Sequence, residues 1–226
     1  TRGGVLVGLF KTEKVYATTG TFYPDADPET STVDGMISYD SDATWATVRD
    51  AITGTIAYDS YPSVQIESRL SAGVYRIDRG FFLFNTSALG AGATISSAVF
   101  SIYGTDTKIE NDSGHATSYV VSSSPASNTA LTTADYDQVG STSFGSISYA
   151  AYSISAYNNY TMNASGLSNI SLTGISKFGL RIYSDYANVA PTGDNLLKFI
   201  NAETADTSQD PKLVVTYTIV IPPKQD

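Results

Sequence analysis

The feature that most constrains the fold is a pair of adjacent segments with different hydropathy patterns, in residues 79–103. Residues 81–84 (Phe-Phe-Leu-Phe) form a continuous apolar run. A turn rich in Gly and Ala follows, and then a run in which Ile95, Val99 and Tyr103 are separated by Ser, Thr and Ala. A continuous apolar run is typical of a strand buried on both faces, and an alternating run of a strand with one face in water. The sequence therefore predicts two packed sheets.

Turn residues divide the rest of the chain into short stretches with strand patterning. Strands are expected at residues 5–10, 33–39, 72–77, 80–84, 95–103, 118–121, 157–163, 177–183, 196–200 and 212–221. In the last of these, one face carries Leu213, Val215, Tyr217, Ile219 and Ile221. The predicted fold class is all-β, a two-sheet antiparallel β-sandwich of jelly-roll type with one or two short helical turns.

Two helical turns and one irregular region are expected between the strands. Thr132-Thr-Ala-Asp135 has the spacing of a capping box, and Gly140 would end the turn that it begins. A second turn is expected at residues 164–170. Residues 39–70 are polar and lack a regular pattern, so we expect long loops that carry a hairpin, which is where binding residues often lie.

Composition excludes several classes of partner. Charged residues make up 15% of the 226-residue chain, and the formal net charge is −9, so a basic surface for nucleic acid is not expected. No apolar run approaches the roughly 20 residues that cross a bilayer, so we expect no membrane insertion. The chain has no cysteine, which excludes disulfides and Cys-ligated zinc. Abundant Ser, Thr, Asn and Tyr with few charges favour an extracellular or cell-surface protein.

The order of these segments resembles the DNRLRE-type module, a secreted jelly-roll sandwich related to carbohydrate-binding modules and found in large cell-surface proteins. The residues that carry the resemblance are Val33-Asp-Gly-Met-Ile37, Arg79-Gly-Phe-Phe-Leu-Phe-Asn-Thr-Ser-Ala-Leu89, Gly92-Ala-Thr-Ile-Ser-Ser-Ala-Val-Phe-Ser-Ile-Tyr103 and Pro211-Lys-Leu-Val-Val-Thr-Tyr217. Asn85 stands where the family pattern has Asp. The resemblance covers about residues 21–218 and implies a fold rather than a ligand.

The sequence contains no recognisable catalytic set. His115 is the only histidine, and no Gly-x-Ser-x-Gly motif accompanies it. Paired carboxylates could serve a glycoside hydrolase, and the candidates are Asp25 with Asp27, Asp34, Asp185, Asp194 with Glu203, and Asp206 with Asp210. Most stand beside turn residues, where Asp caps the local backbone. We therefore expect no enzyme and no cofactor, while calcium bound by acidic loops stays open as an alternative.

Three aromatic residues form a candidate glycan-binding set. Trp45, the only tryptophan, is near Tyr58 and Tyr61 in sequence, and the apolar face of a sugar ring packs on aromatic side chains. In the alternative interpretation, Trp45 closes one end of the core while Arg49 pairs with Asp50 or another carboxylate.

The N-terminal segment is the second candidate site. We divide the chain into an extension, residues 1–20, and a jelly-roll domain, residues 21–226. The extension is apolar on both faces of a predicted strand, with Val5, Val7 and Leu9 on one and Leu6 and Phe10 on the other. Burying these five side chains would contribute about 8 to 15 kcal/mol as an upper bound. The strand either completes its own sandwich or inserts into a neighbouring copy, as in donor-strand complementation.

The leading hypothesis from sequence is an extracellular structural subunit that self-assembles into a filament or surface layer, with copies of itself as partners. A contact of this head-to-tail kind propagates when its rotation does not close a ring. The alternative is a non-catalytic carbohydrate-binding or adhesion module of a larger secreted protein, with glycans as partners.

Overall fold

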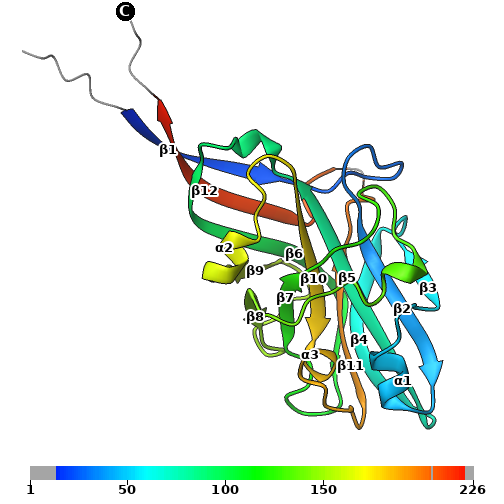
Figure 1. Ribbon diagram of the computed structural model, residues 1–226. Coiled ribbons are helices and arrows are strands. Elements are labelled where there is room, and N and C mark those ends of the chain that lie inside the picture. The colour runs from blue at the N-terminus through cyan, green and yellow to red at the C-terminus, as the bar shows by residue number, and fades with distance from the viewer. Residues whose placement is uncertain (1–13, 205, 222–226) are drawn as a thin grey trace, which may run out of the picture.

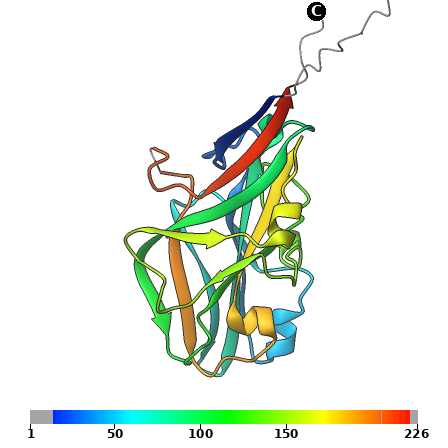
Figure 2. The same cartoon turned by 90° about the vertical axis from the view of Figure 1, so that its left-hand side faces the viewer.

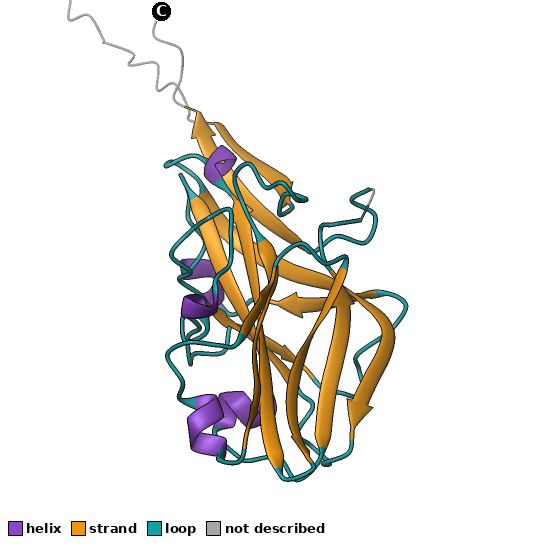
Figure 3. Cartoon of the chain, turned by 90° about the vertical axis from the view of Figure 1, so that its right-hand side faces the viewer, coloured by secondary structure: helices purple, strands orange, loops and turns teal. Residues whose placement is uncertain are grey.

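Antiparallel strands dominate a computed structural model of the chain, which describes residues 14–204 and 206–221. Figures 1 and 3 show that the helices are short and lie at the margins. The strands are β1 (Lys14–Phe22), β2 (Asp34–Asp42), β3 (Ile56–Tyr58), β4 (Ser63–Ser71), β5 (Val74–Asn85), β6 (Thr94–Glu110), β7 (Ser118–Ser122), β8 (Gly145–Ile147), β9 (Tyr157–Thr161), β10 (Ile175–Ile182), β11 (Asp194–Ile200) and β12 (Lys212–Ile221). The helices are α1 (Trp45–Arg49), η1 (Ser87–Leu89), η2 (Thr133–Asp135), α2 (Ala164–Ser168) and α3 (Tyr183–Ala187).

The described strands form one continuous, strongly curled sheet rather than the two separate sheets that the sequence predicted. The main order is β1-β12-β6-β11-β4-β5-β10-β7-β8, with β2, β3 and β9 as side branches. The curl gives the half-barrel seen in Figure 2. The prediction of separate sheets was wrong because β6 is 17 residues long. It pairs with β12 and β9 in its first part and with β11 in its second, so hydrogen bonding continues from one layer into the other.

The expected burial of residues 81–84 on both faces is confirmed. All four side chains have no solvent exposure. Phe82 and Phe84 lie in the larger core inside the curl, while Phe81 and Leu83 lie in a second, smaller core on the opposite face. The second core is covered by α1 and the loop around η2, through residues such as Val48, Leu131 and Tyr136. Each buried side chain of this kind contributes about 1.5 to 3 kcal/mol.

The alternating run after residue 90 forms β6, but its buried face differs from a simple alternation. Ala98, Phe100 and Ile102 are buried, whereas Val99 and Tyr103 are only partly covered. Ile95 nevertheless packs against the larger core. The pairing of β6 with β12 shifts register between the partners of Thr216 and Tyr217, and such a bulge changes which residues face inward.

Both expected helical turns are present. Thr132 and Asp135 make the reciprocal hydrogen bonds of a capping box at the start of η2. The side chain of Asn163 caps α2 by accepting from the Gly166 N–H. The expectation of irregular loops at residues 39–70 was wrong, since α1, β3 and the nine-residue β4 lie there. The strand β4 does carry the alternating pattern of a strand, with Val64, Ile66 and Leu70 separated by polar residues, and the prediction overlooked it.

Candidate functional site

The clearest candidate for an interaction surface is the outer end of the ribbon formed by β1 and β12. These strands pair from Lys14 with Ile221 to Phe22 with Leu213, but β6 accompanies β12 only from Lys212 to Thr218. The last three pairs, Lys14–Ile221, Val15–Val220 and Tyr16–Ile219, therefore form a two-stranded ribbon tip. Figure 1 shows this end of the ribbon extending away from the body. An isolated two-stranded hairpin is only marginally stable in water.

The ribbon tip is apolar on both of its faces. Val15 is 63% exposed, and Val220, directly opposite it, is 49% exposed. Tyr16, which points to the other face, is 46% exposed and lies opposite Ile219. Within the described residues, the outer edge of β1 also has no strand partner. A free edge with apolar faces is a template for pairing with another chain.

The predicted assembly strand precedes this ribbon tip in the sequence, and the polar residues 11–13 separate the two. Its residues, Val5, Leu6, Val7, Leu9 and Phe10, lie outside the described residues. The segment of the predicted extension that is described, residues 14–20, forms most of β1 and pairs with β12. The chain therefore enters the described structure at the outermost pair of the ribbon.

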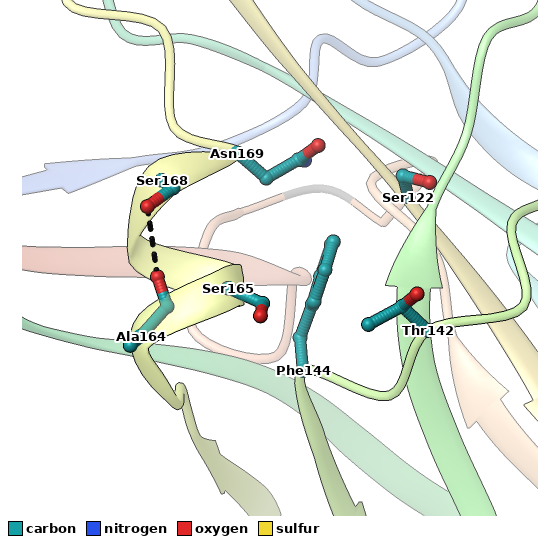
Figure 4. A pocket seen from close by; sticks show the side chains of 7 residues that line it. All are labelled: Ser122, Thr142, Phe144, Ala164, Ser165, Ser168 and Asn169. Carbon is teal, nitrogen blue, oxygen red and sulfur yellow. Dashed lines mark hydrogen bonds between the residues drawn. The ribbon is translucent and has the colours of Figure 1, made fainter.

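Two shallow hollows flank α2. One, of about 410 Å³, is bordered by five apolar residues and one serine, although polar atoms contribute more of its surface than apolar atoms do; these residues are Ala93, Ile95, Leu167, Ser168, Ile170 and Leu172. It lies beside the ribbon, because Ile95 pairs with Tyr217 of β12. The other, of about 480 Å³, is lined by Ser122, Thr142, Phe144, Ala164, Ser165, Ser168 and Asn169. Figure 4 shows Phe144 at its centre, surrounded by uncharged polar groups. None of the residues lining either hollow can serve as an acid or base near neutral pH.

The three aromatic candidates do not form a single strip. Tyr58 and Tyr61 are in edge-to-face contact, with ring centroids 5.2 Å apart, and Tyr61 is 53% exposed. Trp45 instead packs on Tyr75 at 5.5 Å and donates to the Asn188 side chain. Tyr58 lies opposite Met36 and Tyr75 opposite Asp42 along β2, a separation of six residues or roughly 20 Å.

The environment of Trp45 agrees with its alternative interpretation as part of the packing at one end of the molecule. It packs against the smaller core. Arg49 pairs with Asp50 at 2.6 Å, as that interpretation expects.

The most completely paired polar group in the described structure is an Arg–Asp–Arg cluster. The two carboxylate oxygens of Asp185, which is fully buried, each accept one hydrogen bond from Arg79 and one from Arg181, at 2.7 to 2.9 Å. Burial raises the pKa of Asp185, but the two guanidinium groups more than offset this and hold it well below its usual range. The cluster joins β5, β10 and α3.

The other N–H groups of the two arginines donate hydrogen bonds to backbone carbonyls. Arg79 donates to the carbonyls of Tyr136 and Arg49, and Arg181 donates to that of Gly140. The Arg79 guanidinium also lies 4.2 Å from the centroid of the Tyr136 ring. All these groups are used in tying elements together, so the cluster is structural.

The carboxylates predicted to cap turns divide into two groups. Asp25 accepts from the backbone N–H groups of residues 30–32, and Asp206 from that of Ser208, so these two do cap turns. Asp34 and Asp185 are fully buried and bind partners in other segments, so for them the prediction of a turn cap was wrong. The residues next to Asp34 and Asp185 in the sequence are typical of turns, but in the fold both side chains lie between secondary-structure elements.

A carboxylate pair that the sequence did not reveal lies across β4 and β5. Glu67 and Asp78 are direct cross-strand partners, and Arg76 contacts both, at 2.9 and 3.0 Å. Their exposed fractions are 1% and 0%, so a polysaccharide cannot reach them in this conformation. Desolvation and the charge of Asp78 raise the pKa of Glu67 to about 8, despite the two arginines beside it.

His115 has a local partner rather than a catalytic one. Its ring contacts the Asp112 carboxylate and stacks on Tyr183, with centroids 5.2 Å apart. Among the residues that the structure describes, no three Asp, Glu, His or Cys side chains are already arranged as a metal site.

The buried cluster could have been partly anticipated. Arg79 directly precedes a run that is buried on both faces, and a buried charge needs a partner. The identity of that partner has no sequence signal, because Asp185 is 106 residues away.

Neither the family models nor the curated proteins compared with this chain give a match. In the described residues, no helix has the length and apolar character to cross a membrane.

Proposed function

We propose that this protein is an extracellular structural subunit that assembles with copies of itself into a filament or surface layer. The observation that carries the proposal is the ribbon tip, which is apolar on both faces and follows the apolar residues 3–10 after the three polar residues 11–13. Apolar surface in this arrangement favours burial against a second chain. We propose in addition that the protein is related to jelly-roll modules and that it is located at the cell surface.

In the assembly that we propose, residues 5–10 of one copy bind the hollow of about 410 Å³ beside α2 of the next. The hollow lies close to the ribbon, and its Leu and Ile side chains match a strand that carries Val, Leu and Phe. Because β1 runs inward from its tip, the preceding residues attach at the outermost point of the described structure. This position favours contact with a neighbour over a return to the same copy.

The test uses the full chain, a variant lacking residues 1–12, and a double variant Val15→Ser with Val220→Ser. Size-exclusion chromatography with light scattering and electron microscopy should show assemblies for the full chain and monomers for the deletion variant. The double variant should assemble weakly. Ile52→Ser is the matched control, since Ile52 is 75% exposed and follows α1, which lies at the opposite end of the molecule from the ribbon (Figure 1). Undiminished fibres after the deletion would discard strand donation.

The second candidate is a carbohydrate-binding or adhesion module. It is favoured by the contact between Tyr58 and Tyr61, because an exposed tyrosine held by a second ring is a surface on which a sugar can stack. A glycan array should lose its signal with Tyr61→Ala and keep it with Trp45→Ala, since the two sites are separate. Equal binding by wild type and Tyr61→Ala would remove this site.

A further inference from the structure

Three segments that are distant in sequence meet beside the start of β2. Asp34, the first residue of β2, accepts from the Ala202 N–H at 3.2 Å. The Asn201 N–H donates to the Pro62 carbonyl at 3.0 Å. The side chain of Glu203 accepts from the Asp27 N–H at 2.8 Å. These contacts bring together the loop before β2, the segment before β4 and the segment after β11.

Five buried side-chain oxygens in these segments have no hydrogen-bond partner in the described structure. They are Glu29 Oε1, Thr32 Oγ1, Asp34 Oδ1, Asn201 Oδ1 and Glu203 Oε1. The side chains of Thr32, Asp34 and Asn201 are fully buried. The amide nitrogen of Asn201 donates to the Tyr61 carbonyl at 3.3 Å, so its oxygen is left for another ligand. Buried oxygens of this kind normally have a partner, which is a donor, a water or a cation.

The same region concentrates negative charge. Asp27, Glu29, Asp34, Asp59, Glu203 and Asp210 lie in these segments, and within residues 14–204 and 206–221 none of them pairs with Arg, Lys or His. Burial, and then the charges of Glu203, Asp210 and Glu29, raise the pKa of Asp34 well above its usual value, although the Ala202 N–H acts in the opposite direction. A carboxylate in such a place needs either a proton or a cation.

We propose that these oxygens form a Ca²⁺ site, with Thr32, Asp34 and Asn201 as its buried wall and Glu29 and Glu203 closing it from the solvent side. Ca²⁺ takes six to eight oxygen ligands and accepts carboxylate, amide, hydroxyl and water oxygens in flexible geometry. The carboxylates alone do not converge as a metal site, and amide and hydroxyl oxygens complete the donor set. The two glutamates are only half buried, which leaves them free to rotate towards an ion.

The choice of ion follows from the ligands. Zinc prefers nitrogen and sulfur ligands, and the cluster contains neither His nor Cys. Mg²⁺ requires near-ideal octahedral geometry and keeps several of its waters, so a mixed set of loop and strand oxygens favours Ca²⁺. A bound ion would join the start of β2 to the end of β11 and thereby stabilise this end of the sheet.

The experiment compares thermal unfolding of the full chain in Ca²⁺, in Mg²⁺ and in EDTA, with Tb³⁺ luminescence as a direct binding probe. A site of the affinity common in extracellular modules, with a Kd of about 10⁻⁴ to 10⁻³ M, should raise the Tm by about 5 to 10 °C when Ca²⁺ exceeds the Kd about 100-fold. Mg²⁺ should have a much smaller effect. An unchanged Tm in Ca²⁺ together with no Tb³⁺ signal would overturn the proposal.

Substitutions of single residues test which side chains bind the Ca²⁺ ion. Asp34→Asn should weaken Tb³⁺ and Ca²⁺ binding about tenfold or more, and Asp50→Asn, at the C-terminal cap of α1, should leave it unchanged. In EDTA the Asn variant should be at least as stable as the wild type, because it removes a buried charge; in Ca²⁺ the order should reverse. If Asp34→Asn does not fold, Glu203→Gln serves in its place, since its side chain is half buried. Binding that survives both substitutions would place the ion elsewhere and contradict the assignment.

Discussion

The ribbon tip and the centre of the sheet use the same kinds of apolar residue with opposite results. At the centre, β5 is covered on both faces, so Phe81, Phe82, Leu83 and Phe84 have no exposure. At the ribbon tip, Val15 and Val220 pair across two strands and remain half exposed or more. Apolar content alone therefore does not say where the core is, because burial depends on how many neighbours a strand has.

This comparison predicts two separable sets of variants. Substitutions in the centre should change stability without a specific effect on assembly by the folded protein, and substitutions in the ribbon tip should do the reverse.

The largest effect is expected for Phe100→Ala. Phe100 packs against Phe82, Phe84, Phe178 and Tyr160, with ring centroids 5.0 to 6.2 Å apart. Removing the ring should destabilise the protein by about 3 to 5 kcal/mol, because it loses buried surface and leaves a cavity. Chemical denaturation measures this, and a loss below about 1 kcal/mol would mean that the core is not packed as described.

A similar loss, of about 3 kcal/mol or more, is expected for Arg79→Ala, although no large apolar group is removed. The substitution leaves the buried carboxylate of Asp185 with one guanidinium partner instead of two, and removing one member of a buried ion cluster is strongly destabilising. Arg69→Ala is the control: Arg69 is partly exposed and its contact with Glu67 is longer, at 3.4 Å. Equal losses in the two variants would remove the special role assigned to the cluster.

The same cluster predicts an acid dependence. The pKa of Asp185 is lowered in the folded state, so the stability that it contributes is complete above its unfolded value near 3.8 and is lost as the pH falls below it. Denaturation midpoints between pH 7 and pH 2 should fall more steeply for the wild type than for Asp185→Asn. Parallel curves for the wild type and Asp185→Asn would show that Asp185 has the same pKa in the folded and unfolded states.

The smallest effect on stability is expected for Val15→Ser. Its side chain is mostly exposed, so the folded monomer should change by less than about 0.5 kcal/mol. Assembly, followed by light scattering at the same protein concentration, should nevertheless fall clearly. A variant that loses stability but assembles normally would reverse the comparison between ribbon tip and centre.

Local patterns in the sequence predicted much of this fold. The continuous run 81–84, the capping box of η2 and the strand β12 all depend on neighbours in the chain, and these predictions are confirmed. The single curled sheet was not predicted, because it depends on β6 continuing past one set of partners to another. Sequence periodicity shows that a segment is a strand, but it does not show which strands it joins.

The candidate sites also differ in how far local sequence patterns predict them. The apolar N-terminal residues are visible as a pattern, and a second exposed apolar group, at the ribbon tip, follows them after the polar residues 11–14. Asp34 and Asp185 were named from sequence as single carboxylate candidates, but their partners were not predicted, because these are 168 and 106 residues away. Both depend on contacts that only the folded chain creates.

The most direct test of the assembly proposal uses the absence of cysteine from the chain. Val7→Cys and Leu172→Cys are made in separate chains and mixed under oxidising conditions, with each single variant alone as a control. The account predicts a disulfide-linked dimer in the mixture that exceeds anything formed by either variant alone. No such dimer in the mixture, together with a monomeric internal disulfide when both substitutions are in one chain, would show that the segment binds its own copy and would contradict the proposal.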